Sequence, residues 1–430
     1  MASSSSYQSI LNEIPDDIAK IILEKLWTFD RIFLRTVSKA WNAALRQLHG
    51  ARPASELPWK ILSKSFDQGI NPKEIKLLSP SKKVYSFKYP SNGQCCCGSS
   101  QGWLFIGGGG DSVEQIANVL LWNPLSGEVR NLPSLSSLQF FADFVNNGLG
   151  FGLRFLSSFV TRVHVFSTTS GELAAAMIVG CLVLPSYWRV IICTPDDPQW
   201  TVVDLEVSDG NPMDVLFHRG KLIVYCTKWT LSDSDEVIGH GCRTVNLING
   251  GEVEVEVVTM VYGRSRSYSP NREVSRDDCL VAATAASGEI SGEILVVSVT
   301  MDWHASRNER FPSSTWLQIG GFEVQRIDIG GGSPEKLRSI GRQALFVGGG
   351  CDAVSTAVDD IDGGDFSNDS VYFEVNGFWK IWYGENHILE ENYRVHQRVR
   401  FNLRNNVVSV DAISYDRTNS KLVGWFMPKI

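Results

Sequence analysis

The sequence predicts a mainly β protein in which a small N-terminal helical region precedes a β-propeller-like domain of about six to eight blades. Three observations lead to this prediction. Apolar residues recur at helical spacing up to about residue 50. From about residue 57 the chain consists of short β-branched and aromatic runs broken by Gly, Asn, Asp and Pro. Within that second region, a Gly-Glu pair before an apolar run recurs at intervals of roughly 40 residues or twice that, which is typical of propeller blades.

The first element is a helix within "LNEIPDDIAKIILEKL", residues 11–26. Spacings of three and four residues place six apolar side chains on one side of it: Leu11, Ile14, Ile18, Ile21, Ile22 and Leu26. A second helical stretch begins after Asp30, a suitable N-cap, and ends before Gly50 and Pro53. Its apolar positions are Phe33, Leu34, Val37, Trp41, Ala44, Leu45 and Leu48.

These helices need a cover for their apolar side chains. Two or three short helices in roughly 40 residues cannot enclose many of their own apolar groups, and regions this small usually require a staple or a partner. The region has no disulfide or metal-binding pattern. We therefore expect a partner to cover the stripe, with Ile21 and Leu23 holding the helices together.

The second region reads as antiparallel strands. Typical runs are "KVYSFKYP", "GWLFIGGGG", "KLIVYCTKWT", "GEILVVSVT" and "VNGFWKIWYG". In "LLWNPLSGEVRNL", Asn123, Pro124, Ser126 and Gly127 supply turn residues between two strands, and Asn376 with Gly377 does the same further on. Both stretches predict hairpins.

The number of blades follows from the repeat. The Gly-Glu pairs are Gly127-Glu128, Gly171-Glu172, Gly251-Glu252, Gly288-Glu289 and Gly292-Glu293. At roughly 40 to 50 residues per blade, the chain has room for seven or eight blades, and six remains open. A pair of β-sandwiches is the alternative architecture.

Composition limits the possible partners and compartments. The formal net charge of −7 and pI of about 5.6 argue against nucleic acid as the main partner. The start "MASSSSYQSI" lacks the features of a secretory signal, and the longest apolar run, Leu173 to Pro185, is too short to span a membrane. Nine scattered cysteines fit a reducing compartment. We expect a cytoplasmic or nuclear protein.

The N-terminal residues resemble an F-box. The matching positions are Ile14-Pro15, Asp16, Asp17, Ile18, Ile21, Ile22, Leu23 and Leu26, followed by Arg35, Val37, Ser38, Lys39 and Trp41. The resemblance covers residues 11–50, and residues 1–10 are expected to be a disordered N-terminus. Two departures are Ile14 in place of the commoner Leu and a linker without proline between the helices.

Residues 57–430 resemble the plant F-box-associated, kelch-like domain of unknown function. The matching segments include "LPWKIL", "CCCGSSQGWLFI", "LLWNPLSGEVRNLP", "SNDSVYFEV" and the closing "GWFMP". The most specific is "IGRQALFVGGG". The resemblance implies a kelch-like β-propeller.

The two resemblances together imply a substrate-recognition subunit of a Skp–Cullin–F-box ubiquitin ligase. The F-box would dock on the Skp-type adaptor and through it on a cullin, and the propeller would bind an unknown target protein for ubiquitination and degradation. The residues that the resemblance assigns to the adaptor are Ile14, Pro15, Ile18, Ile22, Leu26, Leu34, Val37 and Trp41. Such a receptor is not an enzyme, and no catalytic residue, cofactor or metal is expected.

Candidate chemical motifs favour the same conclusion. Cys95, Cys96 and Cys97 lack the paired spacing of a zinc site, and in a strand neighbouring side chains point to opposite faces. The glycines of "IGGGGDSV", residues 106–113, are followed by neither Lys-Ser/Thr nor an expected helix, so they predict turns. Two alternatives remain open: a propeller-based enzyme with a central pocket, and a DNA-binding protein that uses Arg31, Arg35, Lys39 and Arg46 of the second helix.

Overall fold

The structure is a computed structural model in which most of the propeller and part of the N-terminal region are described. In the N-terminal region these are Pro15, Ile18, Ile21, Ile22, Leu23, Leu26, Asp30, Arg31, Leu34 and Trp41. Beyond it they are residues 57–64, 73–91, 94–108, 112–146, 156–181, 184–203, 205, 210–231, 236–247, 253–264, 272–284, 290–305, 315–328, 334–348, 353–358, 366–375, 397–412 and 420–428.

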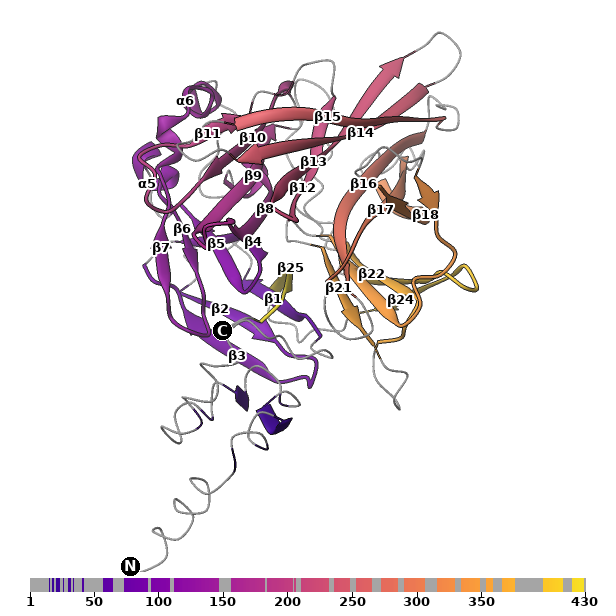
Figure 1. The fold of residues 1–430 in the computed structure, drawn as a ribbon, viewed down its shortest axis with the longest axis horizontal. Coiled ribbons are helices and arrows are strands. Elements are labelled where there is room, and N and C mark those ends of the chain that lie inside the picture. Colours follow the sequence, from indigo (N-terminus) through magenta and orange to yellow (C-terminus); the bar gives the residue numbers. More distant parts are fainter. Residues whose placement is uncertain are drawn as a thin grey trace, which may run out of the picture.

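The described strands form six sheets, which are the blades of a β-propeller (Figure 1). Blade 1 is built from β25 (Ser420–Phe426), β1 (Trp59–Lys64), β2 (Glu74–Leu78) and β3 (Val84–Lys88). Blade 2 contains β4 (Cys95–Ser100), β5 (Trp103–Gly107), β6 (Val119–Trp122) and β7 (Val129–Asn131). Blade 3 contains β8 (Val160–Ser167), β9 (Leu173–Cys181), β10 (Leu184–Cys193) and β11 (Thr201–Val203).

The later blades have longer strands. Blade 4 contains β12 (Asn211–His218), β13 (Lys221–Leu231), β14 (Glu236–Leu247) and β15 (Val253–Arg264). Blade 5 contains β16 (Arg272–Thr284), β17 (Ile290–Ala305), β18 (Thr315–Ile327) and β19 (Glu335–Lys336). Blade 6 has the order β21 (Val354–Ala357), β20 (Gln343–Val347), β22 (Ser370–Val375), β23 (Gln397–Asn402) and β24 (Val407–Ala412).

The mainly β propeller fold predicted from the sequence is confirmed, with a blade number at the lower end of the expected range. The 40-residue period favoured seven or eight blades because it made no allowance for long strands. In blades 4 and 5, several strands have 12 to 16 residues. Each of these blades therefore uses more of the chain than the repeat indicated.

The ring is closed by strands from the two ends of the propeller. The last strand, β25, pairs antiparallel with β1, so that Lys60 lies opposite Trp425 and Lys64 opposite Ser420. This places β25 at the inner edge of blade 1, beside β4 of blade 2. The first blade is thus completed only by the final strand.

Six apolar clusters fill the spaces between neighbouring blades. Because side chains alternate along a strand, the inner strands of each blade pack one face on the preceding blade and the other face on the following blade. Cys96 on β4 faces blade 1, whereas Cys95 and Cys97 face blade 3. Val215 and Leu216 on β12 divide in the same way between blades 3 and 5. Both faces of these inner strands are buried, which explains the continuous apolar runs in the sequence.

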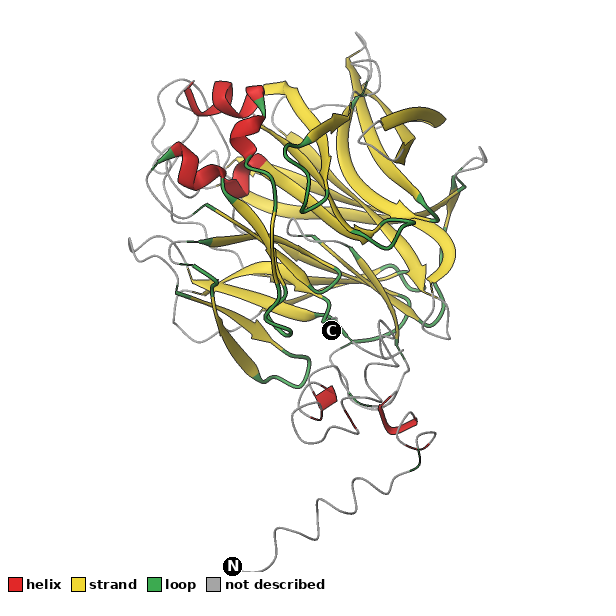
Figure 2. Cartoon of the chain, turned by 60° about the vertical axis from the view of Figure 1, so that its left-hand side comes forward, coloured by secondary structure: helices red, strands yellow, loops and turns green. Residues whose placement is uncertain are grey.

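Among the described residues, four short helices lie between strands of blades 2 and 3 (Figure 2). They are α5 (Val113–Ala117), the 3-10 helix η2 (Leu135–Ser137), α6 (Gln139–Asn146) and α7 (Leu156–Phe159). The expectation that no helix follows the glycines of residues 106–113 was wrong, because α5 begins directly after Ser112. The Ser112 side chain accepts from the Gln115 N–H, and the Gln115 side chain accepts from the Ser112 N–H.

The hairpin predicted around Asn123 is present as β6 and β7. The Asn123 carboxamide oxygen accepts from the backbone N–H groups of Leu125 and Ser126, and Gly127 has a φ of +76°. The hairpin predicted at residues 376–377 lies outside the described residues. Within the part of the chain that the structure covers, no helix is long and apolar enough to cross a membrane. The apolar run from Leu173 instead forms β9 in blade 3.

Candidate partner-binding site

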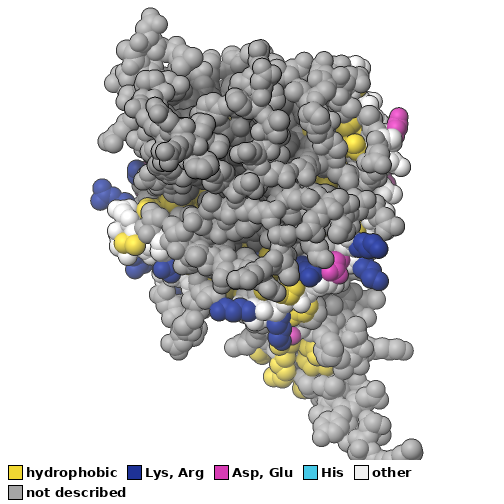
Figure 3. Space-filling model, turned by 180° about the vertical axis from the view of Figure 1, so that it is seen from behind, with side chains coloured by type: hydrophobic (Ala, Val, Ile, Leu, Met, Phe, Trp, Pro, Cys, Tyr) yellow, Lys and Arg dark blue, Asp and Glu magenta, His cyan; other side chains and the backbone are white. Residues whose placement is uncertain are grey.

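The described N-terminal residues expose three large aliphatic side chains. Ile18, Ile21 and Ile22 are helical and are 44%, 50% and 37% exposed. The segment that carries them lies beyond the outer strand of blade 1 (Figure 1). Seen from behind, hydrophobic side chains gather at the lower part of this face (Figure 3). Three exposed isoleucines within five residues form an apolar surface that the described part of the chain leaves uncovered.

Other residues of the same segment are buried. Leu23 is fully buried, and Arg31 donates from Nε to the Leu23 carbonyl oxygen at 2.6 Å. Arg31 is itself only 4% exposed. Its guanidinium therefore satisfies a helical carbonyl group and is not presented to solvent, which removes Arg31 from the set considered for a DNA groove. Arg35, Lys39 and Arg46 of that set lie outside the described residues.

The described residues among those assigned to the adaptor fall into three classes of exposure. Pro15, Ile18 and Ile22 are exposed, and Leu26 and Leu34 are half-buried. Trp41 is 4% exposed, so the structure does not place it at the surface, and its indole N–H has no hydrogen-bond partner among the described residues. Ile14 and Val37 lie outside the described residues.

The prediction that Ile21 and Leu23 both hold the helices together was only half right. Leu23 points inward, as predicted, but Ile21 is the most exposed of the three isoleucines. On a helix, residues 18, 21 and 22 share one face, while residue 23 lies about 100° further round. The exposed face therefore includes Ile21.

At the centre of the propeller, inner strands of neighbouring blades are joined by hydrogen bonds. Ser99 on β4 donates to the Trp425 carbonyl oxygen of β25. Ser100 accepts from the Val165 N–H of β8 at 2.7 Å. The Trp425 indole donates to the Val347 carbonyl oxygen of β20 at 3.3 Å, which joins blade 6 to blade 1.

A charged pair continues these contacts through blades 3, 4 and 5. Arg162 on β8 lies 3.8 Å from Asp214 on β12, and both side chains are nearly buried. The second carboxylate oxygen of Asp214 accepts from the Leu280 N–H of β16 at 2.6 Å. The Arg162 guanidinium also lies 3.5 Å from the Cys279 sulfur. These charged groups are thus engaged by partners in the adjoining blades.

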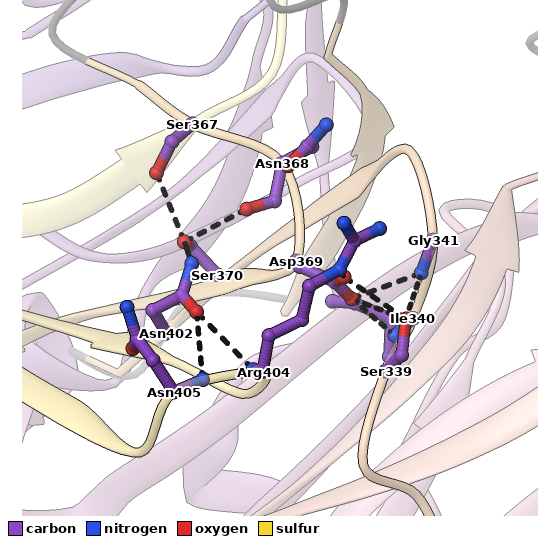
Figure 4. A network of polar contacts seen from close by, with 10 residues as sticks. All are labelled: Ser339, Ile340, Gly341, Ser367, Asn368, Asp369, Ser370, Asn402, Arg404 and Asn405. Carbon is purple, nitrogen blue, oxygen red and sulfur yellow. Dashed lines mark hydrogen bonds and ion pairs between the residues drawn. The ribbon is translucent and has the colours of Figure 1, made fainter.

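A second polar network connects three segments of blade 6 (Figure 4). Fully buried Asp369 accepts from the Ser339 hydroxyl, from the N–H groups of Ile340 and Gly341, and from Arg404. Asp369 has a φ of +52°, a left-handed conformation that Asp tolerates better than most residues. One carboxylate therefore joins the chain before β20, the start of β22 and the turn after β23.

The three adjacent cysteines behave as apolar filling. The sulfurs of Cys95 and Cys97 lie 3.7 Å apart, and all three residues are buried. The hydrogen bond with Cys95, together with burial, raises the pKa of the Cys97 thiol well above its usual value. A protonated thiol is a poor metal ligand. In the described ranges, no three His, Cys, Asp or Glu side chains gather as a metal site would require.

His218 lies where blades 4 and 5 meet. It ends β12, is 6% exposed, and its Nε2 lies 3.2 Å from the Gly292 carbonyl oxygen of β17. Burial lowers the pKa of His218, and nearby Arg219 lowers it further, while the hydrogen bond to Gly292 acts in the opposite direction. The neutral imidazole is therefore favoured as a donor to this carbonyl group.

Comparison with protein families agrees with this architecture. The KIB1-4 beta-propeller model matches residues 75–396, which is most of the chain. This chain belongs to the KIB1-4 β-propeller family. The match begins in β2 and ends before β23, so the KIB1-4 region takes in all or part of every blade. The exposed isoleucines lie before it. The comparison with curated proteins gives no match.

Solved structures resemble the KIB1-4 chain only distantly. An α-L-arabinanase from Penicillium chrysogenum complexed with arabinobiose has a TM-score of 0.29 and 12% identity, over 87% of this chain and 85% of that chain. A mutant of the α-L-arabinofuranosidase Arb93a from Fusarium graminearum, in complex with an iminosugar inhibitor, has a TM-score of 0.27 and 9% identity, over 86% and 85%. Likenesses of this size carry no conclusion about activity.

Proposed function

We propose that this chain is the substrate-recognition subunit of a Skp–Cullin–F-box ubiquitin ligase. Its N-terminal segment docks on the Skp-type adaptor, and its propeller binds a target protein. The complex works by proximity: the receptor raises the effective concentration of target lysines near a charged conjugating enzyme, which needs no catalytic residue in this chain. The protein acts in the cytoplasm or the nucleus.

The observation that carries this proposal is the exposure of Ile18, Ile21 and Ile22. Fully burying an isoleucine side chain contributes about 1.5 to 3 kcal/mol, and covering the exposed part of each of these three contributes roughly half of that, so a partner that covers them gains stability. Two of the three, Ile18 and Ile22, are among the residues that the F-box resemblance assigns to the adaptor. Leu26 and Leu34, which belong to the same assignment, are half-buried.

The propeller supports the second half of the proposal. Its blades are tied to one another by apolar clusters and inner hydrogen bonds, which provides a rigid scaffold. Rigid scaffolds commonly carry binding groups on their loops and edges. A KIB1-4 propeller is consistent with protein binding of this kind.

The proposal is tested by co-purification with a Skp-type adaptor. Ile18→Lys combined with Ile22→Lys places two charges on the proposed contact and should abolish co-purification. These positions are preferable to Trp41, whose burial means that its removal also disturbs folding. Val129→Lys is the matched control, because Val129 is 40% exposed on β7 of the propeller. The Val129→Lys variant should bind the adaptor normally.

Circular dichroism separates loss of binding from loss of folding, since the propeller of each variant should keep its β signal. Adaptor binding by the double variant at the level of the unmodified protein would overturn the assignment of residues 11–50 to an F-box.

A further inference from the structure

The outer hairpin of blade 1 is basic in an acidic protein. Residues 73–88 contain five lysines and one glutamate, while the whole chain has a formal net charge of −7. The lysines are Lys73, Lys76, Lys82, Lys83 and Lys88. Lys76 forms an ion pair with the glutamate, with Nζ 3.8 Å from Glu74, and Lys88 lies opposite Glu74 in the β2–β3 register. Lys73, Lys83 and Lys88 are exposed and form no ion pair with any described residue.

The hydrogen-bond pattern of this hairpin leaves an open edge. Among the described strands, β3 pairs only with β2. The Ser79 N–H donates to the Lys83 carbonyl oxygen, and the Tyr89 N–H donates to that of Lys73. In an antiparallel pair, every second residue is bonded to the neighbouring strand. The bonded positions of β3 are therefore residues 83, 85, 87 and 89, so the backbone N–H and C=O groups of Val84, Ser86 and Lys88 point away from β2.

The side chains of β3 hold this edge in place. Tyr85 stacks on Trp59 of β1, with ring centroids 5.1 Å apart, and Phe87 packs on the cluster between blades 1 and 2. Val84, by contrast, is 53% exposed, and Ser86 and Lys88 are exposed as well. A strand fixed on one side and open on the other is prepared to accept a further strand.

We propose that β3 is a docking edge for an acidic, extended segment of a partner protein, which adds to blade 1 as a fifth strand. The partner backbone pairs with Val84, Ser86 and Lys88, and its carboxylates lie beside Lys82 and Lys83 at one end and Lys88 and Lys73 at the other. The proposed partner segment would belong to the target protein, and its role as a ubiquitination target rests on the proposed function. The binding itself does not, because it requires no adaptor.

The lysines give the edge its selectivity. Lysines on an edge strand discourage pairing with apolar or basic strands, including a second copy of the same edge. An acidic strand meets no such repulsion and gains a cross-strand pair with Lys88 on one face of the sheet or with Lys83 on the other, because residues 83 and 88 lie on opposite faces. The same groups that prevent unspecific pairing therefore admit one class of partner.

A peptide fits this surface better than nucleic acid or a membrane. Outward N–H and C=O groups at every second residue match another peptide backbone, and neither a phosphate chain nor a lipid surface offers that alternation. The basic surface covers one five-residue strand and its turn. The negative charge of the rest of the chain repels long polyanions.

The test uses the full chain without the adaptor and a short fluorescent peptide of alternating glutamate and valine. We expect saturable binding by fluorescence anisotropy that weakens as salt is raised. Ser86→Pro should weaken it at least about tenfold, because proline removes one outward N–H and leaves the ladder to β2 intact. Lys83→Glu combined with Lys88→Glu should weaken it by a similar factor.

Two variants serve as matched controls. Val129 occupies the corresponding outward position on β7, the open edge of blade 2, because the bonded positions there include Glu128 and Leu132. Val129→Pro should leave peptide binding unchanged, and so should Lys221→Glu on β13, which reverses an exposed charge elsewhere.

Several results would overturn the proposal. Equal binding by the Ser86→Pro variant would show that backbone pairing plays no part. Equal binding of a peptide that alternates glutamate and proline would show the same. Lysine-dependent binding of single-stranded DNA or phosphatidylserine vesicles, without binding of the glutamate-valine peptide, would assign the surface to another class of partner. Retained adaptor binding in any of these cases would leave the proposed function standing.

Discussion

The indole nitrogen of Trp425 donates a hydrogen bond to the carbonyl oxygen of Val347 at 3.3 Å, and this contact joins the last strand of the chain to blade 6. Trp425 is 1% exposed, packs edge-on against Phe346 at 5.0 Å, and lies beneath the Lys60 ammonium group. Its side chain therefore occupies the seam where the propeller closes.

Removing this side chain should destabilise the whole propeller. We expect Trp425→Ala to lower the free energy of unfolding by about 3 to 5 kcal/mol, and Trp425→Phe by less, because phenylalanine keeps much of the apolar contact and loses the hydrogen bond. Urea unfolding followed by circular dichroism measures both. Val407→Ala, at a site 52% exposed on blade 6, should change stability by less than about 0.5 kcal/mol. Equal effects at the two sites would contradict this account.

The buried pair of Arg162 and Asp214 provides a second prediction. Asp214→Ala leaves Arg162 without its carboxylate and the Leu280 N–H without its acceptor, so the free energy of unfolding should fall by about 3 to 5 kcal/mol. Asp214→Asn should cost less, since its amide oxygen still accepts from Leu280. Thermal and urea unfolding of the two variants test the order, and a larger loss for Asn than for Ala would count against it.

Asp369 should stabilise blade 6 through its hydrogen bonds more than through its backbone conformation. Asp369→Ala removes the acceptor for the Ile340 and Gly341 N–H groups and places alanine at positive φ, and we expect a loss of about 2 to 4 kcal/mol. Asn406 has a similar φ of +56° in an exposed turn, so Asn406→Ala measures the conformational part alone. If both variants lose the same stability in urea unfolding, the network contributes nothing.

The lowered pKa of His218 predicts a dependence of stability on pH. The unfolded chain, with a histidine pKa near about 6.5, takes up a proton more readily than the folded protein. The contribution of His218 is therefore fully present at neutral pH and is lost as the pH falls below about 6.5. His218→Gln keeps a donor for the Gly292 carbonyl and cannot be protonated.

The comparison is made between urea midpoints at about pH 7.5 and about pH 5.5. The unmodified protein should lose more stability over this interval than the His218→Gln variant. An identical loss in both would show that other groups account for the acid sensitivity.

The propeller was predictable because its inner strands are buried on both faces. Runs such as "KLIVYCTKWT" and "GEILVVSVT" predicted strands, and the turn residues around Asn123 predicted a hairpin. Blade number was harder, because it depends on how much chain each blade uses. Gly292-Glu293 of the repeat lies within β17, but the repeat does not indicate that β17 has 16 residues and β16 has 13.

The helix between β5 and β6 could have been found. Ser112 and Gln115 have the spacing of a capping box, and the glycines before them drew attention to turns instead. The inner contacts could not have been found in this way. Arg162, Asp214 and Leu280 come from three consecutive blades, and no local pattern connects residues that meet only when neighbouring blades pack together.

At the N-terminal segment, helical spacing predicted an apolar face but could not divide it between solvent and core. Ile21 and Leu23 were both expected to hold the helices together, yet one is exposed and the other fully buried. That division depends on which side of the helix meets the remainder of the chain, and tertiary packing alone decides it.

The closing strand also determines when the protein can fold as it is being made. Ser99 and the Trp425 carbonyl that it contacts are 326 residues apart in the chain. At ribosomal rates of roughly 5 to 20 residues per second, the nascent first blade waits on the order of tens of seconds for its inner strand. During translation, the apolar surface around Trp59 and Ile61 is left for chaperones to shield, and a message truncated before β25 would yield an open ring and a substrate for degradation.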